Sequence, residues 1–173
     1  MRQFWQTLKP ENLTDNVFDL VGNQWMLISA GEIGAFNTMT ASWGCLGVLW
    51  RKQVAVCFVR PSRHTFSFIN KAAYYTLSVL PEENRGILDF CGANSGRDTD
   101  KIAKTGLKPV DIEGKGVSFE QASLVLLCRK LYTQDFDPSL FLDPEIQNLY
   151  PKKDYHRVFV GEIELCLSRA AAV

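Results

Sequence analysis

The feature that most constrains the fold is a series of short apolar segments that do not alternate with long helices. At least six segments have the β-branched and aromatic composition, or the alternating pattern, of strands. They cover residues 25–30, 36–43, 53–59, 74–80, 122–135 and 155–168. A doubly wound parallel sheet would place a helix after nearly every strand. The sequence therefore predicts a mainly β fold, a barrel or a sandwich, with a few added helices.

Four of these segments carry a more specific signal. Residues 25–30 and 36–43 flank the turn sequence GEIG and are expected to form a hairpin. Residues 53–59 are continuously apolar, which predicts a strand buried on both faces, and Pro61 ends it. In residues 155–168, apolar side chains alternate with acidic ones over most of the run, as in a strand with one buried face and one wet face.

Short helices are expected between the strands, each marked by a polar cap, a glycine or a proline. They are expected over residues 14–22, 62–71, 82–91, the stretch that ends at Gly106, and 143–150. The expected caps are Thr14 or Asp15 for the first helix, Ser62 for the second and Asp98 for the fourth. Gly22 is expected to end the first helix.

The balance of charge excludes one class of function. The 173 residues include 19 basic and 19 acidic side chains, so the chain lacks the positive field needed for sequence-independent nucleic-acid binding. The sequence contains no signal-peptide core and no apolar stretch of about 18 residues. We therefore expect a cytoplasmic protein with no membrane partner, folded as one domain over residues 1–173.

The cysteines and histidines point away from a metal centre. The five cysteines are far apart and form no CxxC pair, and His64 and His156 are the only histidines. Cys57 and Cys128 lie in apolar runs and are expected to be buried thiols. Cys91 is expected in a polar loop. The sequence also lacks a Rossmann fingerprint, a P-loop, an HExxH motif and a GxSxG motif.

Hydroxyls, an amide and a large aromatic ring lie together on the second predicted strand. This run consists of Asn37, Thr38, Met39, Thr40, Ala41, Ser42 and Trp43. Its composition also fits an ordinary threonine-rich strand, because threonine is a common strand residue. The residues alone leave both interpretations open.

A second polar run follows the buried strand and opens a helix. It contains Arg60, Ser62, Arg63, His64 and Thr65. Unpaired N–H groups at a helix start attract anions, and arginine makes bidentate bonds with phosphate. The run therefore fits a phosphate site, and it fits a capped helix with solvated arginines equally well.

A third run, SGRDTDK at residues 95–101, is on its own typical of a surface turn and a helix cap.

Together the three runs resemble the flavin reductase-like, FMN-binding split-barrel family, and its flavoredoxin-type branch. N-T-M-T-A-S-W-G-x-L-G at residues 37–47 is similar to the family's flavin-binding strand and loop. F-V-R-P-S-R-H-T at 58–65 is similar to its phosphate-binding turn, and C-G-x-x-S-G-R-D-x-D-K at 91–101 to a further loop. The resemblance extends over residues 20–168.

This resemblance implies an antiparallel, Greek-key type split β-barrel that binds FMN as a homodimer, with sites near the subunit interface. The first run would line the isoalloxazine and ribityl chain, the second would hold the phosphate, and the third would assist. The FMN-binding residues implied are Asn37, Thr38, Met39, Thr40, Ala41, Ser42, Trp43, Arg60, Ser62, Arg63, His64, Thr65, Asp100 and Lys101. The sequence departs from the family at His64, where an aromatic residue is expected, and at Cys45, where glycine is expected.

The function implied is that of an oxidoreductase with no catalytic acid or base of its own, because the flavin carries the hydride chemistry. NADH, NADPH or a redox partner protein would supply electrons, which would pass to free flavin, ferric complexes or another protein. Two alternatives stay open. One is a non-enzymatic electron carrier of the flavoredoxin type, and the other is a flavin-binding module without turnover.

Overall fold

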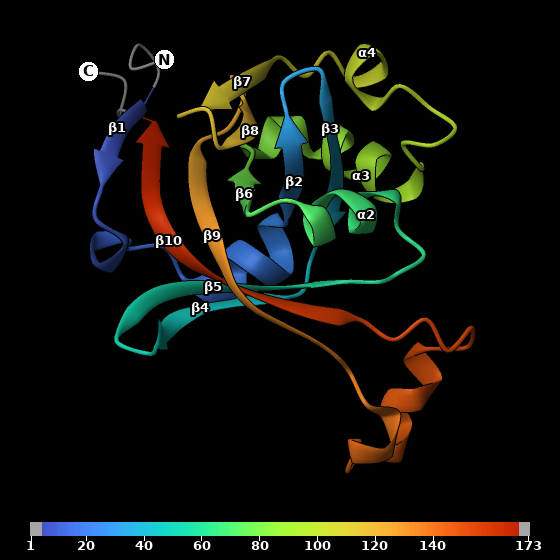
Figure 1. Cartoon of the computed structure of the whole chain (residues 1–173). Helices are drawn as coiled ribbons and strands as arrows, with labels where there is room; N and C mark the ends of the chain where they lie inside the picture. Colours follow the sequence, from blue (N-terminus) through green and yellow to red (C-terminus); the bar gives the residue numbers. More distant parts are fainter. Residues whose placement is uncertain (1–4, 170–173) are drawn as a thin grey trace.

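The computed structural model, which describes residues 5–169, is built around a curled eight-stranded sheet (Figure 1). Its strands are β1 (Trp5–Leu8), β2 (Met26–Glu32), β3 (Ala35–Ala41), β4 (Gly44–Leu49), β5 (Lys52–Val59), β6 (Tyr74–Val79), β9 (Leu124–Asp135) and β10 (Arg157–Arg169). Their order is β3-β2-β6-β9-β10-β5-β4, and β1 pairs with β10. Each of these pairings is antiparallel. The predicted mainly β architecture is therefore confirmed, including the hairpin of β2 and β3.

The two end strands of this sheet approach each other where the chain passes from one to the other, and we call this opening the seam. β3 and β4 stand at opposite ends of the strand order, yet only Ser42 and Trp43 separate them in the chain. A few extended residues span only about 10 Å, so the sheet must curl until its ends approach each other. β3 and β4 are not hydrogen-bonded to each other, so the curled sheet stays open along this seam.

Alternating side chains bury both faces of the sheet. Met26 and Ile28 of β2 join the core inside the curl, whereas Leu27 joins a second core on the outer face. β9 alternates in the same way, with Leu126 inside and Leu127 outside. The outer core is covered by α3 (Arg85–Ala93) and by a small sheet of β7 (Pro109–Ile112) and β8 (Gly116–Phe119).

The other helical segments are short and lie at the ends of strands (Figure 1). They are α1 (Val17–Asp19), the π-helix η2 (Leu20–Gln24), α2 (His64–Lys71), α4 (Lys101–Thr105), and the 3₁₀ helices η1 (Pro10–Asn12), η3 (Glu82–Asn84), η4 (Pro138–Leu140) and η5 (Pro144–Leu149). None of the helices within residues 5–169 is long and apolar enough to cross a membrane.

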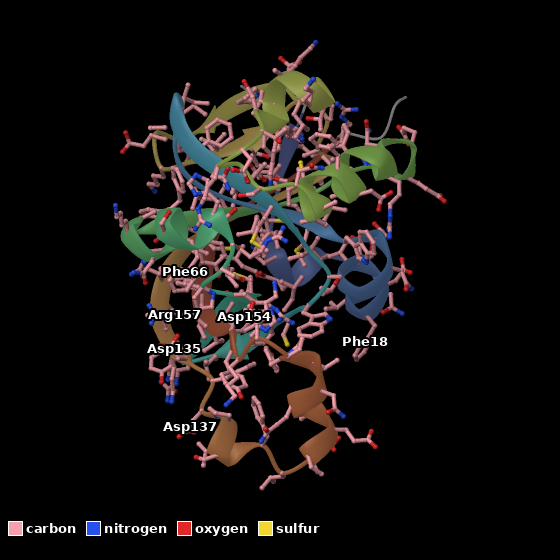
Figure 2. The ribbon with its side chains drawn as sticks, turned by 90° about the vertical axis from the view of Figure 1, so that its right-hand side faces the viewer. Phe18, Phe66, Asp135, Asp137, Asp154 and Arg157 are labelled. Carbon is pink, nitrogen blue, oxygen red and sulfur yellow. The ribbon has the colours of Figure 1, made fainter. Side chains whose placement is uncertain are left out.

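Residues 136–156, between β9 and β10, project from the sheet as an arm that carries η4 and η5 (Figure 1). The root of this arm is fastened to the barrel by Arg60, which pairs with Asp154 at 2.9 Å and donates to the Leu149 carbonyl at 2.9 Å. The rings of Phe58 and Phe136 add a contact with centroids 5.5 Å apart. Figure 2 shows Asp154 where the arm meets the barrel.

Four strands were not predicted from the sequence, namely β1, β4, β7 and β8. The predicted strand 36–43 ends at Ala41, and β4 starts directly after Trp43. Gly44 and Gly47 concealed β4 because glycine is rare in strands. The prediction that residues 53–59 are buried on both faces is wrong, because Gln53 is exposed and Val56 and Phe58 are only partly buried, with Phe58 facing a cavity.

The predicted helix caps were each misplaced by one or two residues. The caps are Asn16 for α1, Arg63 for α2 and Asp100 for α4, instead of Thr14 or Asp15, Ser62 and Asp98. Asn16 and Asp100 accept bonds from N–H groups of the first turn. Ser62 stands one residue before the cap of α2, and its hydroxyl donates to Asp154 at 2.8 Å. The first helical segment also continues past Gly22 to Gln24.

Candidate functional site

Two adjoining cavities form a groove at the seam, with an aromatic end and a polar end. The aromatic end has a volume of about 350 Å³ and is lined by Trp25, Met39, Thr40, Ala41, Ser42, Trp43, Phe58, Arg60, Arg63, Gly92 and His156. The polar end has a volume of about 140 Å³ and is lined by Asn37, Met39, Ser62, Arg63, His64, Thr65, Ala93, Asn94, Ser95, Gly96 and Lys101. Met39 and Arg63 line both ends, so the two cavities adjoin.

Three rings from distant parts of the chain shape the aromatic end. The centroid of Trp43, in the link between β3 and β4, lies 5.1 Å from that of His156 at the start of β10. The ring of Phe58 meets His156 edge-on at 6.5 Å. Trp43 is 43% exposed and leaves this end open to solvent. The result is an open apolar slot suited to a planar ring system.

His156 takes part in this slot as a neutral imidazole. Its side chain is buried, and its Nδ1 lies 2.7 Å from the hydroxyl of Tyr150 in the arm. Burial, reinforced by the nearby charge of Arg60 and opposed by Asp154, lowers the pKa of His156 to about 4. At neutral pH the ring therefore adds a polar but uncharged edge to the aromatic end.

The start of α2 forms one wall of the polar end. Free N–H groups at the first turn of a helix favour an anion, and the helix dipole acts in the same direction. Thr65 in this turn accepts a hydrogen bond at 2.7 Å from the side-chain amide of Asn37 on β3. The Arg63 guanidinium crosses the groove and donates to the Gly92 carbonyl at 2.9 Å. The wall thus connects β3, α2 and the end of α3.

Two cations, one buried and one partly buried, lie at the polar end without an acidic partner. Lys101 is only 5% exposed, and its ammonium donates to the carbonyls of Thr38 and Cys91, both at 2.9 Å. Burial lowers the pKa of Lys101 to about 8, while Cys91 opposes and Arg63 adds to the effect. Burial, followed by the charge of Arg60, also lowers the pKa of Arg63. Neither cation forms an ion pair with any carboxylate of residues 5–169.

Two further polar side chains of the 60–65 run, Arg60 and Ser62, have a different partner. Asp154 accepts from Arg60 at 2.9 Å and from Ser62 at 2.8 Å, and Arg60 also lies over the Tyr150 ring at 4.7 Å. These contacts hold the root of the arm against the barrel. A role for Arg60 and Ser62 in holding phosphate stays a prediction, since Asp154 already offsets the charge of Arg60.

Most of the residues expected at the site do line the groove. The exceptions are Thr38 and Asp100. The side chain of Thr38 is buried behind the wall, where its hydroxyl donates to the Ile28 carbonyl, and Asp100 is exposed at the start of α4. Lining residues absent from the expected FMN-binding set are Trp25, Phe58, Gly92, Ala93, Asn94, Ser95, Gly96 and His156. The runs at 58–65 and 91–101 include Phe58, Gly92, Ser95 and Gly96, whereas Trp25 and His156 lie outside every run and reach the groove through tertiary packing.

The cysteines are mainly structural. Cys57 and Cys128 are buried as predicted, and burial raises the pKa of both thiols. Cys91 is buried in α3 rather than placed in a polar loop, and burial raises the pKa of its thiol as well. Cys45 is exposed on β4 and does not line the groove. Within the described residues, no group of three His, Cys, Asp or Glu side chains could hold a metal ion.

Several solved structures share this fold at low sequence identity. A flavoredoxin from Methanosarcina acetivorans is 21% identical with a TM-score of 0.70, covering 96% of this chain and 78% of that one. The FMN-binding domain of a flavin reductase-like enzyme from Shewanella baltica is 17% identical with a TM-score of 0.69, covering 95% and 77%. A Streptomyces globisporus NADH:FAD oxidoreductase in complex with NAD and FAD fragments is 15% identical with a TM-score of 0.62, covering 85% and 74%. No curated protein sequence matches the chain.

A curled antiparallel sheet that stays open along one seam, and carries a groove there, defines the split β-barrel class. The sequence model for the flavin reductase like domain matches residues 18–171, which is nearly the whole chain. The chain therefore belongs to the flavin reductase-like domain family.

Proposed function

We propose that the groove binds FMN, with the phosphate at the polar end and the isoalloxazine ring at the aromatic end. The observation that carries this proposal is a pair of cations, the buried Lys101 and the partly buried Arg63, that have no carboxylate partner among residues 5–169. Burying an uncompensated charge is costly. A phosphate dianion would supply the missing negative charge at the start of α2.

The residues present fit such a ligand in chemistry as well as in charge. The polar end holds donors of the kind that bind phosphate oxygens, namely the hydroxyls of Thr65 and Ser95 and the first N–H groups of α2. Gly96 borders the polar end where a Cβ would overlap the Asn37 side chain, so the backbone approaches closely there. At the other end, Trp43 and Phe58 offer apolar surface for a flat ring.

The proposed activity is that of a flavin reductase-like oxidoreductase. FMN, when bound, supplies the chemistry of hydride and electron transfer. The chain's own residues would bind and orient the ring, and His156 would present an uncharged edge to it. The open side at Trp43 would admit a nicotinamide ring from NADH or NADPH. Electrons would pass on to free flavin, ferric complexes or another protein.

A second candidate is a flavoredoxin-type carrier that exchanges electrons only with protein partners. The fold similarity to the Methanosarcina acetivorans flavoredoxin, and to a second one from Desulfovibrio vulgaris, favours this alternative. The Streptomyces globisporus oxidoreductase favours the first. Both candidates require the same flavin site and differ in the electron donor.

The purified protein should be yellow, or should take up FMN in a one-to-one titration followed by flavin fluorescence. A protein that stays colourless and does not bind flavin would refute the proposal.

Anaerobic stopped-flow mixing then separates the two candidates. Bleaching of the flavin by NADH or NADPH supports the reductase. Bleaching by dithionite but by neither nucleotide supports the protein-to-protein carrier.

We also propose that the protein is a homodimer. Large apolar side chains are exposed on the β4–β5 hairpin, as with Val48 at 75% and Trp50 at 55%, and on the arm, as with Leu142 at 99%. Exposed aromatic and aliphatic side chains of this kind are typical of subunit interfaces. In Figure 1 the turn of the hairpin lies at the left and the arm at the lower right.

A further inference from the structure

The polar end of the groove is closed by a direct contact between β3 and the loop that joins α3 to α4. A Cβ built on Gly96 in this loop would overlap the Oδ1 of Asn37, so the Asn37 amide packs on the glycine backbone itself. The Nδ2 of the same amide donates to the Thr65 hydroxyl at 2.7 Å. Asn37 is therefore held between the loop on one side and the first turn of α2 on the other.

A further cavity lies directly behind this contact, and we call it the outer cavity. Its volume is about 390 Å³, and Asn37, Gly96 and Lys101 line both it and the polar end of the groove. Its remaining lining residues are Phe36, Thr38, Arg97, Asp98, Thr99, Asp100 and Ile102. The Asn37–Gly96 contact is thus a thin partition between the small polar end and a larger polar space.

The partition matters for the length of the ligand. FMN ends at one phosphate, whereas FAD continues through a second phosphate to an adenosine. The polar end, at about 140 Å³, has room for a single phosphate group against α2. A second phosphate continuing along the groove would meet the Asn37 side chain, which Thr65 and Gly96 prevent from swinging aside.

We propose that Asn37, held against Gly96, ends the groove after one phosphate and so makes the site select FMN over FAD. This inference rests on the proposed function and adds to it the residue that sets the flavin specificity. A smaller side chain at position 37 should remove this preference for FMN, because the outer cavity offers space for the rest of FAD. Arg97 of this cavity forms no ion pair with any carboxylate of residues 5–169 and could meet a second phosphate, and Phe36 offers a ring for the adenine.

The test is a fluorescence titration of the full chain with riboflavin, FMN and FAD. The wild type should bind FMN at least about tenfold more tightly than FAD, because a ligand forced against a packed side chain loses roughly that much or more. Asn37→Ala should bring the ratio of the two affinities close to one, mainly by tightening FAD. Asn37→Ser gives the same test in a variant that retains a polar group, should the alanine variant not fold.

Asn37→Leu is the matched control, because leucine keeps the bulk of the side chain and removes only the amide. It should keep the preference for FMN. A wild type that binds FMN and FAD equally overturns the inference. It is also overturned if Asn37→Ala keeps the wild-type preference for FMN, because the Asn37 side chain would then not end the groove. A wild type that binds riboflavin and FMN but shows no such preference leaves the proposed function standing. A wild type that binds no flavin refutes both the proposed function and this inference.

Discussion

Arg63 and Lys101 reach the polar end from different elements, the residue before α2 and the first residue of α4. Each uses part of its donor capacity on backbone carbonyls of α3 or β3. These bonds hold the two charges in place without neutralising them. A side chain held in this way loses little entropy when a ligand arrives, so the site is prepared for an anion in advance.

Arg63→Ala should weaken FMN far more than riboflavin, because only FMN carries the phosphate. A hydrogen bond to a charged group contributes about 1.5–3 kcal/mol, so the expected loss is roughly tenfold to hundredfold. Fluorescence titration with both flavins measures the effect. Arg97→Ala, a change of the same kind at an exposed arginine of the nearby loop, is the control and should leave the FMN affinity close to that of the wild type. Equal losses for FMN and riboflavin would place Arg63 away from the phosphate.

The ratio of FMN to riboflavin affinity should fall as pH rises through about 8. Lys101 has a lowered pKa of about 8 in the free protein, and a phosphate dianion is attracted only to the protonated ammonium. The extra affinity for FMN is therefore complete below pH 8 and declines above it, by at most about tenfold per pH unit. Titrations from pH 7 to 9.5 test this. Lys101→Arg should flatten the curve, because a guanidinium stays charged over this range. A flat wild-type ratio would contradict the prediction.

Among the elements, the long apolar strands could be read directly from the sequence. β6, β9 and β10 were predicted to within a few residues because their patterns repeat over many positions. β1, β7 and β8 were missed because four-residue strands carry little pattern of their own. The lining residues of the groove were predicted where they belong to the local sequence runs at β3 and at the start of α2. Trp25 and His156 were missed because they lie outside these runs, and only tertiary packing brings them to the groove.

The free energy of unfolding should depend on pH, because His156 at the root of the arm is buried in the folded protein. The pKa of His156 is about 4 in the folded protein and near 6.5 when unfolded, so the unfolded chain binds a proton more readily. Its contribution to stability is present above pH 6.5 and is lost as pH falls toward 4, by an amount on the order of 3 kcal/mol. Urea unfolding at pH 7 and pH 4.5 measures the loss.

The variant His156→Gln should lose less stability than the wild type over the same pH range, because glutamine does not titrate. His64→Gln is the matched control, since it changes the chain's other histidine and leaves the Tyr150–His156 pair intact. If His156→Gln and the wild type lose stability in parallel, the histidine does not carry the effect.

For the whole molecule, the exposed apolar side chains of the hairpin and the arm predict a dimer. Sedimentation at micromolar concentration should show two chains per particle. The double variant Val48→Asp and Leu142→Asp should shift the protein toward monomer, because it introduces charges into surface that association would bury. Phe18→Asp is the control, a change at an equally exposed ring (Figure 2) that lies on α1 rather than on the hairpin or the arm. A wild-type monomer would contradict the proposal.

The position of β10 also governs how this chain can be assembled during synthesis. β10 is the last described strand to leave the ribosome, yet it lies in the middle of the sheet, between β9 and β5, and carries β1 as well. Until it emerges, β5 and β9 each present an unpaired edge of the kind that promotes aggregation. Pairs such as Trp5 with Arg169 join opposite ends of the described chain, so barrel closure is a late event with a high entropic cost. The nascent chain therefore leaves those edges unpaired until its final described strand is available.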